Sequence, residues 1–367
     1  MKKYLPVIAS LIAVVLFCIA GIRQEGRQAV RHALDLCING LIPAVFPSLC
    51  ISEYLMVSGL WRRIRIPFVA DLFGLPPSSS SAVLLGFICG FPTAAILAQE
   101  MYEKGAVNEK EGRDICIFCS MPSLSFTVGY VGGELLKSVW LGAALYAVTL
   151  FSSILLGVLL SLFRERRASL NTEKDTEEPK LLSAVVPSVR RAVPKLANVC
   201  AFVIFFSVVA SALIKVDRNA EAVLLSFLEI TAGTKALVFS HVETSLVLMS
   251  ASLGFSGVSV MCQIFACAPS IPLGKYFPAK LINSFISAIT AAALIALPPV
   301  LFATVIFAVL TAVFVICKKR SLAALEKSVD PREHKQNTET ALKKTFRKLS
   351  DKQRSKKTSE SAYRTYQ

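Results

Sequence analysis

Charge, histidine and tryptophan are scarce in this chain of 367 residues. Charged residues make up 18% of it, and it has three histidines and two tryptophans. Soluble domains carry about 25% charged residues, so the composition excludes an ordinary soluble enzyme as a description of the whole chain. Hydrophobic residues make up 54%, which excludes a disordered chain because disorder requires low hydrophobicity.

Sequence motifs of common catalytic sites are absent as well. The three histidines form no H-E-x-x-H motif and no pair on one predicted helix, which argues against a histidine metal site. There is no G-x-x-x-x-G-K-[ST] loop for ATP and no G-x-S-x-G nucleophile elbow. We therefore expect no enzyme activity and no cofactor, although residue types leave open an intramembrane hydrolase that uses a serine of Ser120–Ser125 and a lysine.

Cysteine, in contrast, is abundant, with ten residues. Most of them lie inside apolar runs, where a free thiol behaves as a small hydrophobic side chain. Cys116 and Cys119 form a single C-x-x-C motif without a second pair. A role in helix packing is therefore favoured over zinc or redox chemistry.

The apolar residues are concentrated in runs of about 20 residues, the length that crosses a hydrocarbon core as a helix. This pattern predicts an all-α, polytopic integral membrane protein embedded in the lipid bilayer. The first run, Tyr4–Ile22, is interpreted as an uncleaved anchor, with a secretory signal as the alternative. The other runs are Leu36–Leu60, Ala82–Met101, Ile115–Val131, Ser138–Phe163, Ala197–Val216, Ala222–Phe239, Ser245–Ala268, Leu281–Leu297 and Val300–Cys317.

Basic residues in short loops mark the cytoplasmic side of a membrane protein. They occur at Lys2-Lys3, Arg62–Arg65, Arg164–Lys195 and in the tail from Lys318, with Lys275 and Lys280 as a weaker fifth group. The tail has 15 Lys and Arg against 6 Asp and Glu, so its net charge is 15 − 6 = +9. We expect it to bind anionic lipid headgroups and not nucleic acid, and we expect both chain termini to be cytoplasmic.

The positions of these basic groups predict an inverted repeat. Between Arg65 and Gly133, and again between Val216 and Lys280, two apolar runs must supply an odd number of crossings, so one run in each half is re-entrant. Each half of the chain then consists of a spanning run, two broken runs and a second spanning run. The two halves have opposite orientations, as in many secondary transporters. The predicted segments are an anchor and loop (1–35), a first repeat (36–163), a cytoplasmic linker (164–196), a second repeat (197–297), a last transmembrane helix (298–317) and a basic tail (318–367).

Four of the apolar runs are interrupted by residues that disturb helices. Proline removes a backbone donor, and glycine lets the chain bend. Backbone groups freed in this way cannot face lipid, so they must face protein or a water-filled cavity. The interruptions are Gly90–Thr93, Ser120–Ser125, Glu229–Lys235 and Ser252–Ser259. A solute site between the breaks is favoured, and close helix packing is the alternative.

Charged side chains inside apolar runs are costly and mark either function or pairing. Glu229 is the strongest candidate for binding a cation, a proton or a substrate, with an ion pair to Lys235 as the alternative. Glu53 is a second candidate, and Gln263 is a midspan amide. The predicted substrate-binding residues are Glu229, Thr231, Gly233, Ser256, Gln263, Ser120, Gly90, Pro92 and Glu53.

Several motifs occur in an order that resembles one known family. They are Leu41–Pro47 with Ser52-Glu53, Gly86–Pro92 with Glu100–Gly105, Phe118-Cys119 with Gly129, Leu228–Gly233, and Gly254–Val260 with Gln263. Between Leu36 and Leu297 the chain resembles the sporulation integral membrane proteins of the nucleoside-recognition, or gate-domain, family. The resemblance implies a multi-pass protein of the cell membrane of spore-forming bacteria, linked to spore maturation or cortex formation.

The chain departs from the family pattern at several polar positions. Ala94 and Ile96 stand where the family has a glycine and a basic residue, Ser120-Met121-Pro122 where it has paired asparagines before Gly-Pro, and Met261 where it has a histidine. We therefore expect a different or degraded site. The leading hypothesis is a transporter or permease for a small polar solute, acting by alternating access, and the alternative is a non-transporting scaffold for spore-envelope assembly. A homo-oligomer is left open.

Overall fold

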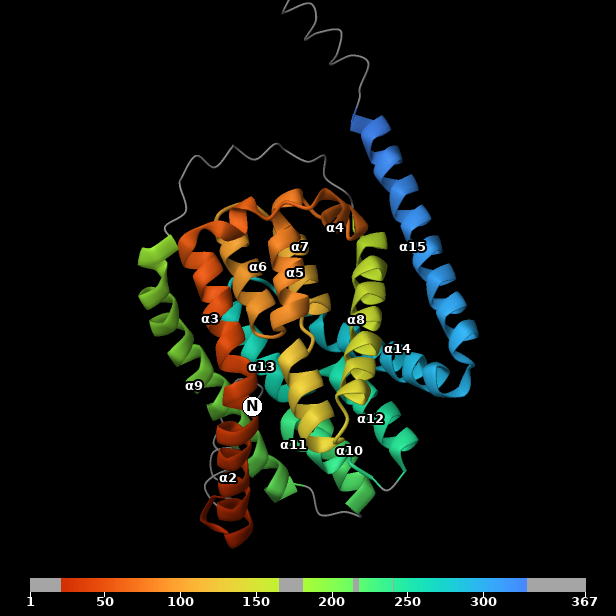
Figure 1. Ribbon diagram of the computed structural model, residues 1–367. Helices are drawn as coiled ribbons and strands as arrows, with labels where there is room; N and C mark the ends of the chain where they lie inside the picture. The colour runs from red at the N-terminus through yellow and green to blue at the C-terminus, as the bar shows by residue number, and fades with distance from the viewer. Residues whose placement is uncertain (1–20, 165–180, 214–217, 240, 329–367) are drawn as a thin grey trace, which may run out of the picture. The chain divides into compact units, whose positions relative to one another are not determined.

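In a computed structural model of the chain, the described residues are 21–164, 181–213, 218–239 and 241–328 (Figure 1). These residues form helices joined by turns and bends, and no strand occurs among them. Five helical segments are long and apolar enough to cross a membrane, which confirms the predicted all-α, polytopic architecture. They are Gln24–Ser58, Val139–Leu162, Leu181–Ser211, Val242–Cys267 and Tyr276–Ala296.

The chain divides into two compact units. Residues 1–165 and 171–317 form the first unit, and residues 166–170 and 318–367 form the second. Of the second unit the structure describes only residues 318–328, which end helix α15 (Pro299–Ser328). The predicted anchor at 4–22 lies outside the described residues up to residue 20, as do residues 165–180 of the predicted linker and most of the predicted basic tail. Both predicted repeats belong to the first unit.

The first repeat is a long helix, a hairpin, a broken helix and another long helix. The hairpin consists of α5 and α6, which lie side by side because small residues face each other: a Cβ at Gly86 would lie only 2.8 Å from Cβ of Ala94. The elements are α2 (Gln24–Leu36), η1 (Cys37–Leu41), α3 (Ile42–Ser58), η2 (Leu60–Arg63), α4 (Pro67–Leu72), η3 (Pro77–Ser79), α5 (Ser80–Cys89), α6 (Thr93–Glu103), α7 (Glu109–Phe118), η4 (Ser125–Leu135) and α8 (Val139–Leu162).

The second repeat has the same order of elements. Its hairpin consists of α10 and α11, which approach so closely that a Cβ at Gly233 would lie 2.2 Å from Cα of Ser226. The elements are α9 (Leu181–Leu213), α10 (Arg218–Leu228), α11 (Ile230–Ala236), α12 (Val242–Phe255), α13 (Gly257–Cys267) and α14 (Tyr276–Ala296).

The two hairpins enter the helix bundle from opposite ends (Figure 1). The α5–α6 hairpin opens toward the end that carries α4, which we call the α4 end, and the α10–α11 hairpin opens toward the other end, which we call the α10 end. The predicted runs Ala82–Met101 and Ala222–Phe239 are therefore the re-entrant ones. The inverted repeat predicted from the sequence is confirmed in its order of elements and in its opposite orientations.

The first helix of each repeat is longer than its apolar run. The run Leu36–Leu60 continues a helix that begins at Gln24, and the run Ala197–Val216 continues one that begins at Leu181. A search for apolar runs misses these starts because they are amphipathic and carry polar residues on one face. The predicted break at Pro298-Pro299 is confirmed, since α14 ends at Ala296 and α15 begins at Pro299.

One sequence inference is wrong. The sequence predicts that Lys280 marks a cytoplasmic loop, but its side chain is completely buried within α14. The residue follows only five positions after Lys275, which is exposed at the start of the helix. The two lysines look alike in the sequence because both stand next to an apolar run, and only the packing of α14 separates them.

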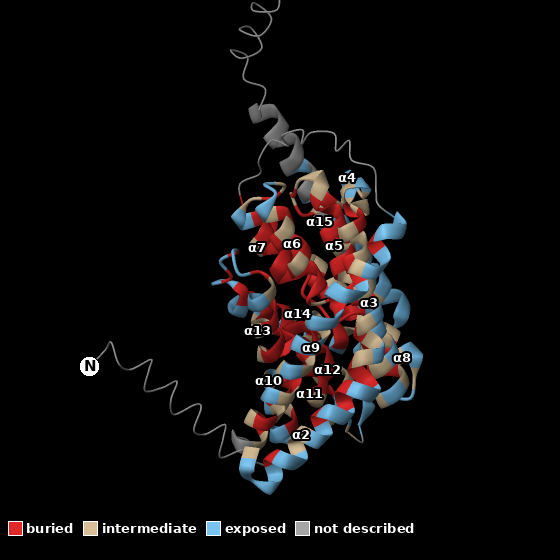
Figure 2. Cartoon of the chain, turned by 90° about the vertical axis from the view of Figure 1, so that its left-hand side faces the viewer, coloured by how far each residue is buried: buried red, intermediate tan, exposed pale blue. Residues whose placement is uncertain are grey.

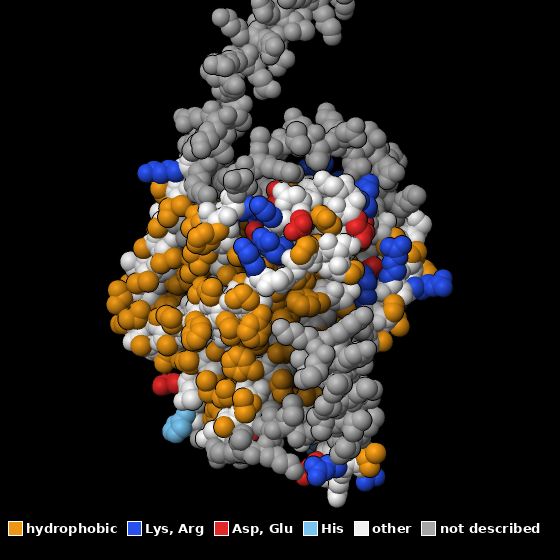
Figure 3. All heavy atoms as spheres, turned by 180° about the vertical axis from the view of Figure 1, so that it is seen from behind, with side chains coloured by type: hydrophobic (Ala, Val, Ile, Leu, Met, Phe, Trp, Pro, Cys, Tyr) orange, Lys and Arg blue, Asp and Glu red, His pale blue; other side chains and the backbone are white. Residues whose placement is uncertain are grey.

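The surface of the unit matches a lipid environment. Figure 2 shows buried residues on the inner faces of the helices and exposed residues outside, and Figure 3 shows hydrophobic side chains over the middle of one face with Lys and Arg mostly near the ends. Exposed large apolar residues include Trp140, Phe163, Phe285 and Ile289. A bilayer removes such residues from water, so their exposure is consistent with membrane insertion.

Two largely buried ion pairs join neighbouring helices. Arg164, after α8, pairs with Asp114 of α7 and also donates to the carbonyl oxygens of Phe73 (2.7 Å) and Gly74 (2.9 Å) at the α4 end. Charges of this kind must be paired and hydrogen-bonded to be tolerated away from water. The second pair joins the first helices of the two repeats, from Lys195 of α9 to Glu53 of α3.

Candidate functional site: four helix breaks

The tip of the first hairpin lies on the break between α7 and η4. Gly90 turns the chain with φ of +71°, and a Cβ there would lie 2.4 Å from the backbone nitrogen of Ser123. The next residue, Phe91, donates its backbone N–H to the carbonyl of Met121 at 3.0 Å. Glycine is required here because any side chain would collide with the facing backbone. This contact brings the predicted residues Gly90 and Pro92 next to the segment that follows Ser120.

The tip of the second hairpin lies on the break between α12 and α13. Ser256 and Gly257 both adopt left-handed backbone conformations, with φ of 75° and 81°. A Cβ at Gly257 would lie 3.3 Å from the backbone nitrogen of Ile230 and 3.5 Å from the carbonyl oxygen of Leu228. The second repeat therefore pairs its hairpin tip with its helix break in the same way as the first repeat.

The two pairs of breaks meet each other at the carbonyl of Ser120. The Ser256 hydroxyl donates to this oxygen at 3.2 Å, and the Lys280 ammonium donates to it at 2.6 Å. Close by, the side-chain amide of Asn283 donates to the carbonyl of Gly254 at 2.9 Å, just before the α12 break. The four helix breaks of the two inverted repeats thus surround the Ser120 carbonyl. We call the region around this oxygen the break centre.

Glu229 lies at the tip of the second hairpin and is 1% exposed. Its carboxylate accepts hydrogen bonds from the backbone N–H groups of Thr231 (3.0 Å) and Ala232 (2.6 Å), so it caps the start of α11. The alternative ion pair with Lys235 is not formed, because the Lys235 side chain is exposed and the carboxylate is engaged with its own helix. A carboxylate at this tip gives the break centre a negative group on one side.

The other predicted residues fall in different places. Gln263 is buried in α13 beyond the break and donates to the Ser259 hydroxyl at 3.4 Å. Gly233 serves the close packing within the second hairpin. Glu53 is paired with Lys195 between α3 and α9, so it is not one of the residues at the breaks. Ser120, Ser256, Thr231, Gly90 and Pro92 belong to the four breaks.

Sequence reasoning missed the polar face of α14. Lys280, Asn283, Ser284, Ser287 and Thr290 recur at intervals of one to three residues, which places them along one side of a helix, and all five are buried. A spacing of this kind in an apolar helix indicates a polar stripe directed into the protein, and it is readable from the sequence.

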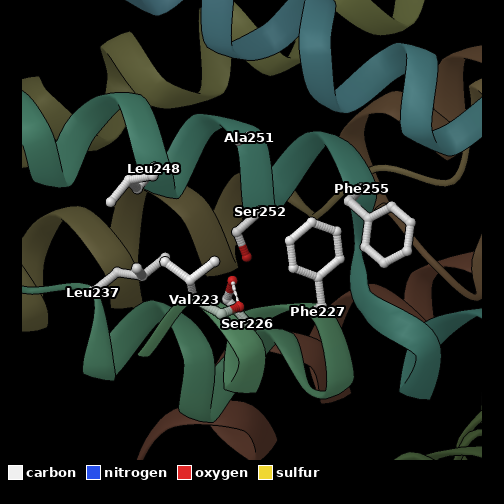
Figure 4. Close-up of a pocket in the computed structure, with 8 residues that line it drawn as sticks. All are labelled: Val223, Ser226, Phe227, Leu237, Leu248, Ala251, Ser252 and Phe255. Carbon is white, nitrogen blue, oxygen red and sulfur yellow. Dashed lines mark hydrogen bonds between the residues drawn. The ribbon is translucent and has the colours of Figure 1, made fainter. Parts of the chain in front are cut away.

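Several buried polar atoms near the α12 break have no hydrogen-bond partner among the described residues. They include Oγ of Ser252, Oδ1 of Asn283, Oγ of Ser287 and Oε1 of Gln263. Ser252 points into a cavity of about 40 Å³ between α10 and α12, where Ser226 faces it (Figure 4). The cavity exceeds the space of about 15 Å³ that one water needs, but six of its eight lining residues are apolar, and Ser226 and Ser252 are its polar ones.

No family profile matches the chain, and no curated protein or solved structure is significantly similar to it. The resemblance to the gate-domain proteins therefore stays a prediction based on the motifs.

Proposed function

We propose that this protein is a membrane permease that moves a small polar solute through the break centre by alternating access. The observation that carries the proposal is the meeting of four helix breaks, two from each inverted repeat, at the carbonyl of Ser120. Discontinuous helices at a repeat interface are where secondary transporters bind their solutes. The motif resemblance adds the proposal that this permease acts in spore formation in the cell membrane.

Few hydrogen bonds join the repeats at the break centre itself, whereas elsewhere α3 and α9 are joined by the ion pair of Glu53 with Lys195. At the break centre the repeats are joined by the hydrogen bonds from Ser256 and Lys280 to one carbonyl oxygen. A rocking motion that separates Ser256 from Ser120 would expose the breaks to one side. The unpartnered atoms of Ser252, Asn283 and Gln263 would then be available to bond a solute, which is why the proposed solute is polar.

A larger cavity supplies an approach from the α10 end. It has a volume of about 300 Å³ and lies between α2, α9 and the second hairpin. His32, Ser207 and Glu221 are among the residues that line it, together with Ala232, whose backbone N–H bonds Glu229. We place the α4 end in the cytoplasm because Arg62, a residue of the predicted basic group, belongs to it and basic residues favour that side.

A ligand screen tests the proposal across several classes of solute. The thermal stability of the purified protein would be measured with nucleosides, amino acids, dipicolinate and cell-wall precursors. A compound that binds only the folded state raises stability by about 2.7 kcal/mol at 100 times its Kd. We expect at least one polar compound to raise the Tm, and failure of every compound would contradict the proposal.

The variant Glu229→Gln then connects binding to transport. It keeps the size of the side chain but removes its charge, and we expect solute uptake into proteoliposomes to be lost while membrane levels stay normal. The matched control is Glu243→Gln, because Glu243 is an exposed glutamate of the same repeat, in the first turn of α12, and lines neither cavity. Full uptake by a well-expressed Glu229→Gln protein would argue against a role of this carboxylate.

A scaffold that assembles partners or lipid is the second candidate, and the net charge of +9 in the tail from Lys318 favours it. Removal of residues 329–367 separates the two functions while keeping every helix from α2 to α15. A scaffold would lose its function in spore formation, whereas a permease would keep most of its uptake.

A further inference from the structure

Among the residues that the structure describes, Lys280 is the one fully buried cation that is hydrogen-bonded to a neutral group instead of a carboxylate. Its side chain is 0% exposed, and its ammonium donates to the Ser120 carbonyl at 2.6 Å. The buried Arg164 and the half-buried Lys195 differ, because each pairs with a carboxylate, Asp114 and Glu53 respectively. A lysine inside a membrane segment is costly, so its place at a backbone carbonyl calls for an explanation.

The Ser120 carbonyl lies where a cation is favoured. It follows the end of α7 at Phe118, and the C-terminal end of a helix carries partial negative charge. The oxygen is not used in the ladder of α7, and it accepts hydrogen bonds from side chains of the second repeat. Free carbonyls at such half-helix ends are the groups with which transporters coordinate sodium or protons.

We propose that the Lys280 ammonium is a built-in cation that takes the place of a bound metal cation at the α7 break. The enclosure of the ammonium favours this role over capture of an anionic solute, because the group faces a carbonyl within the protein. The break centre therefore closes without sodium or potassium. This inference concerns the ion requirement and does not depend on whether the protein transports a solute.

The other donors from the last helix of each repeat support this assignment. Tyr146 of α8 donates its hydroxyl to the Phe87 carbonyl at 2.7 Å, and Asn283 of α14 donates to the Gly254 carbonyl at 2.9 Å. Both donors are neutral, and both satisfy carbonyls near a break. Lys280 also donates to a carbonyl near a break, but its side chain is charged and it lies where the two repeats meet.

The test is the effect of cations on the thermal stability of the purified full chain. Tm would be measured in lithium, sodium, potassium and choline chloride at equal ionic strength, for the wild-type protein and for Lys280→Ala. We expect the same wild-type Tm in all four salts. We expect Lys280→Ala to have a lower Tm in choline chloride and to regain stability with an alkali cation or with methylammonium, which fits where the lysine ammonium was.

Two matched variants make the result specific. Lys280→Met fills the same space without charge, so added cations should not restore it. Lys275→Ala removes an exposed lysine from the start of the same helix, and its Tm should equal that of the wild type in every salt. The proposal is overturned by a wild-type Tm that rises specifically with one alkali cation. It is equally overturned by a Lys280→Ala protein that no cation, including methylammonium, stabilises.

Discussion

The two repeats share one architecture but hold it together with different chemistry. In the first repeat a charged pair, Arg164 with Asp114, joins α8 to α7, and the hairpin tip touches the facing backbone at Gly90. In the second repeat, α14 is joined to α12 by neutral hydrogen bonds, from Asn283 to Gly254 and from Ser284 to the Ala251 carbonyl at 2.8 Å.

The difference extends to the break centre. The first repeat contributes main-chain carbonyls there, of which Ser120 is the shared acceptor, while the second repeat contributes the side chains of Ser256 and Lys280. Main-chain groups are fixed by the fold, whereas side chains can be exchanged by single substitutions. In the proposed permease, the side chains that select the solute would therefore come from the second repeat.

The largest expected effect tests the ion pair of the first repeat. Asp114→Ala leaves Arg164 buried without its carboxylate, and loss of one partner of a buried pair costs about 3–5 kcal/mol of unfolding free energy. Thermal or denaturant unfolding in detergent would measure the loss. Glu100→Ala is the control, since its pair with Lys104 is partly exposed and should contribute at most about 1 kcal/mol. Equal losses in the two variants would show that the buried pair of Arg164 and Asp114 stabilises the first repeat no more than a partly exposed pair does.

The second-largest loss of unfolding free energy is expected at the tip of the first hairpin. Gly90→Ala combines an unfavourable φ with a backbone clash, and we expect a loss of about 3 kcal/mol. Gly105→Ala is a close control because Gly105 also has a positive φ, +70°, but nothing lies within 4 Å of its Cβ position. It should lose only about 1 kcal/mol, the cost of the backbone conformation. If the two variants unfold alike, the tip does not sit on the α7 break.

The smallest effects compare the neutral donors of the two last helices. Asn283→Ala removes the donor to Gly254, which is buried, and should cost about 2 kcal/mol. Tyr146→Phe removes the donor to Phe87 while keeping the ring, and should cost about 1 kcal/mol. Uptake measurements sharpen the comparison, because only Asn283→Ala is expected to alter solute binding. A stronger effect of Tyr146→Phe on uptake would assign solute selection to the first repeat instead.

Much of this fold is predictable from the sequence, because the breaks are encoded by residues with strong backbone preferences. Gly90, Pro92 and the Ser256-Gly257 pair mark two of the four breaks, and the basic groups at Arg62–Arg65 and Arg164 require a re-entrant run in the first half. The chemistry of the break centre is harder to predict from the sequence. Lys280 resembles a loop marker because its burial depends on contacts with segments far away in the chain, and the capping role of Glu229 depends on local geometry that residue type does not specify.

The central claim is that the four breaks border a hydrated centre, and thiol labelling tests it most directly. Single cysteines would replace Thr93, Ser123, Thr231 and Ser256, one from each break, in a background without native cysteines that is shown to fold. Thr149→Cys is the control, because Thr149 is buried in α8 with its hydroxyl bonded within the helix. We predict that the break positions react with a small water-soluble reagent while the control does not. Protection of all four positions in every condition would contradict the account.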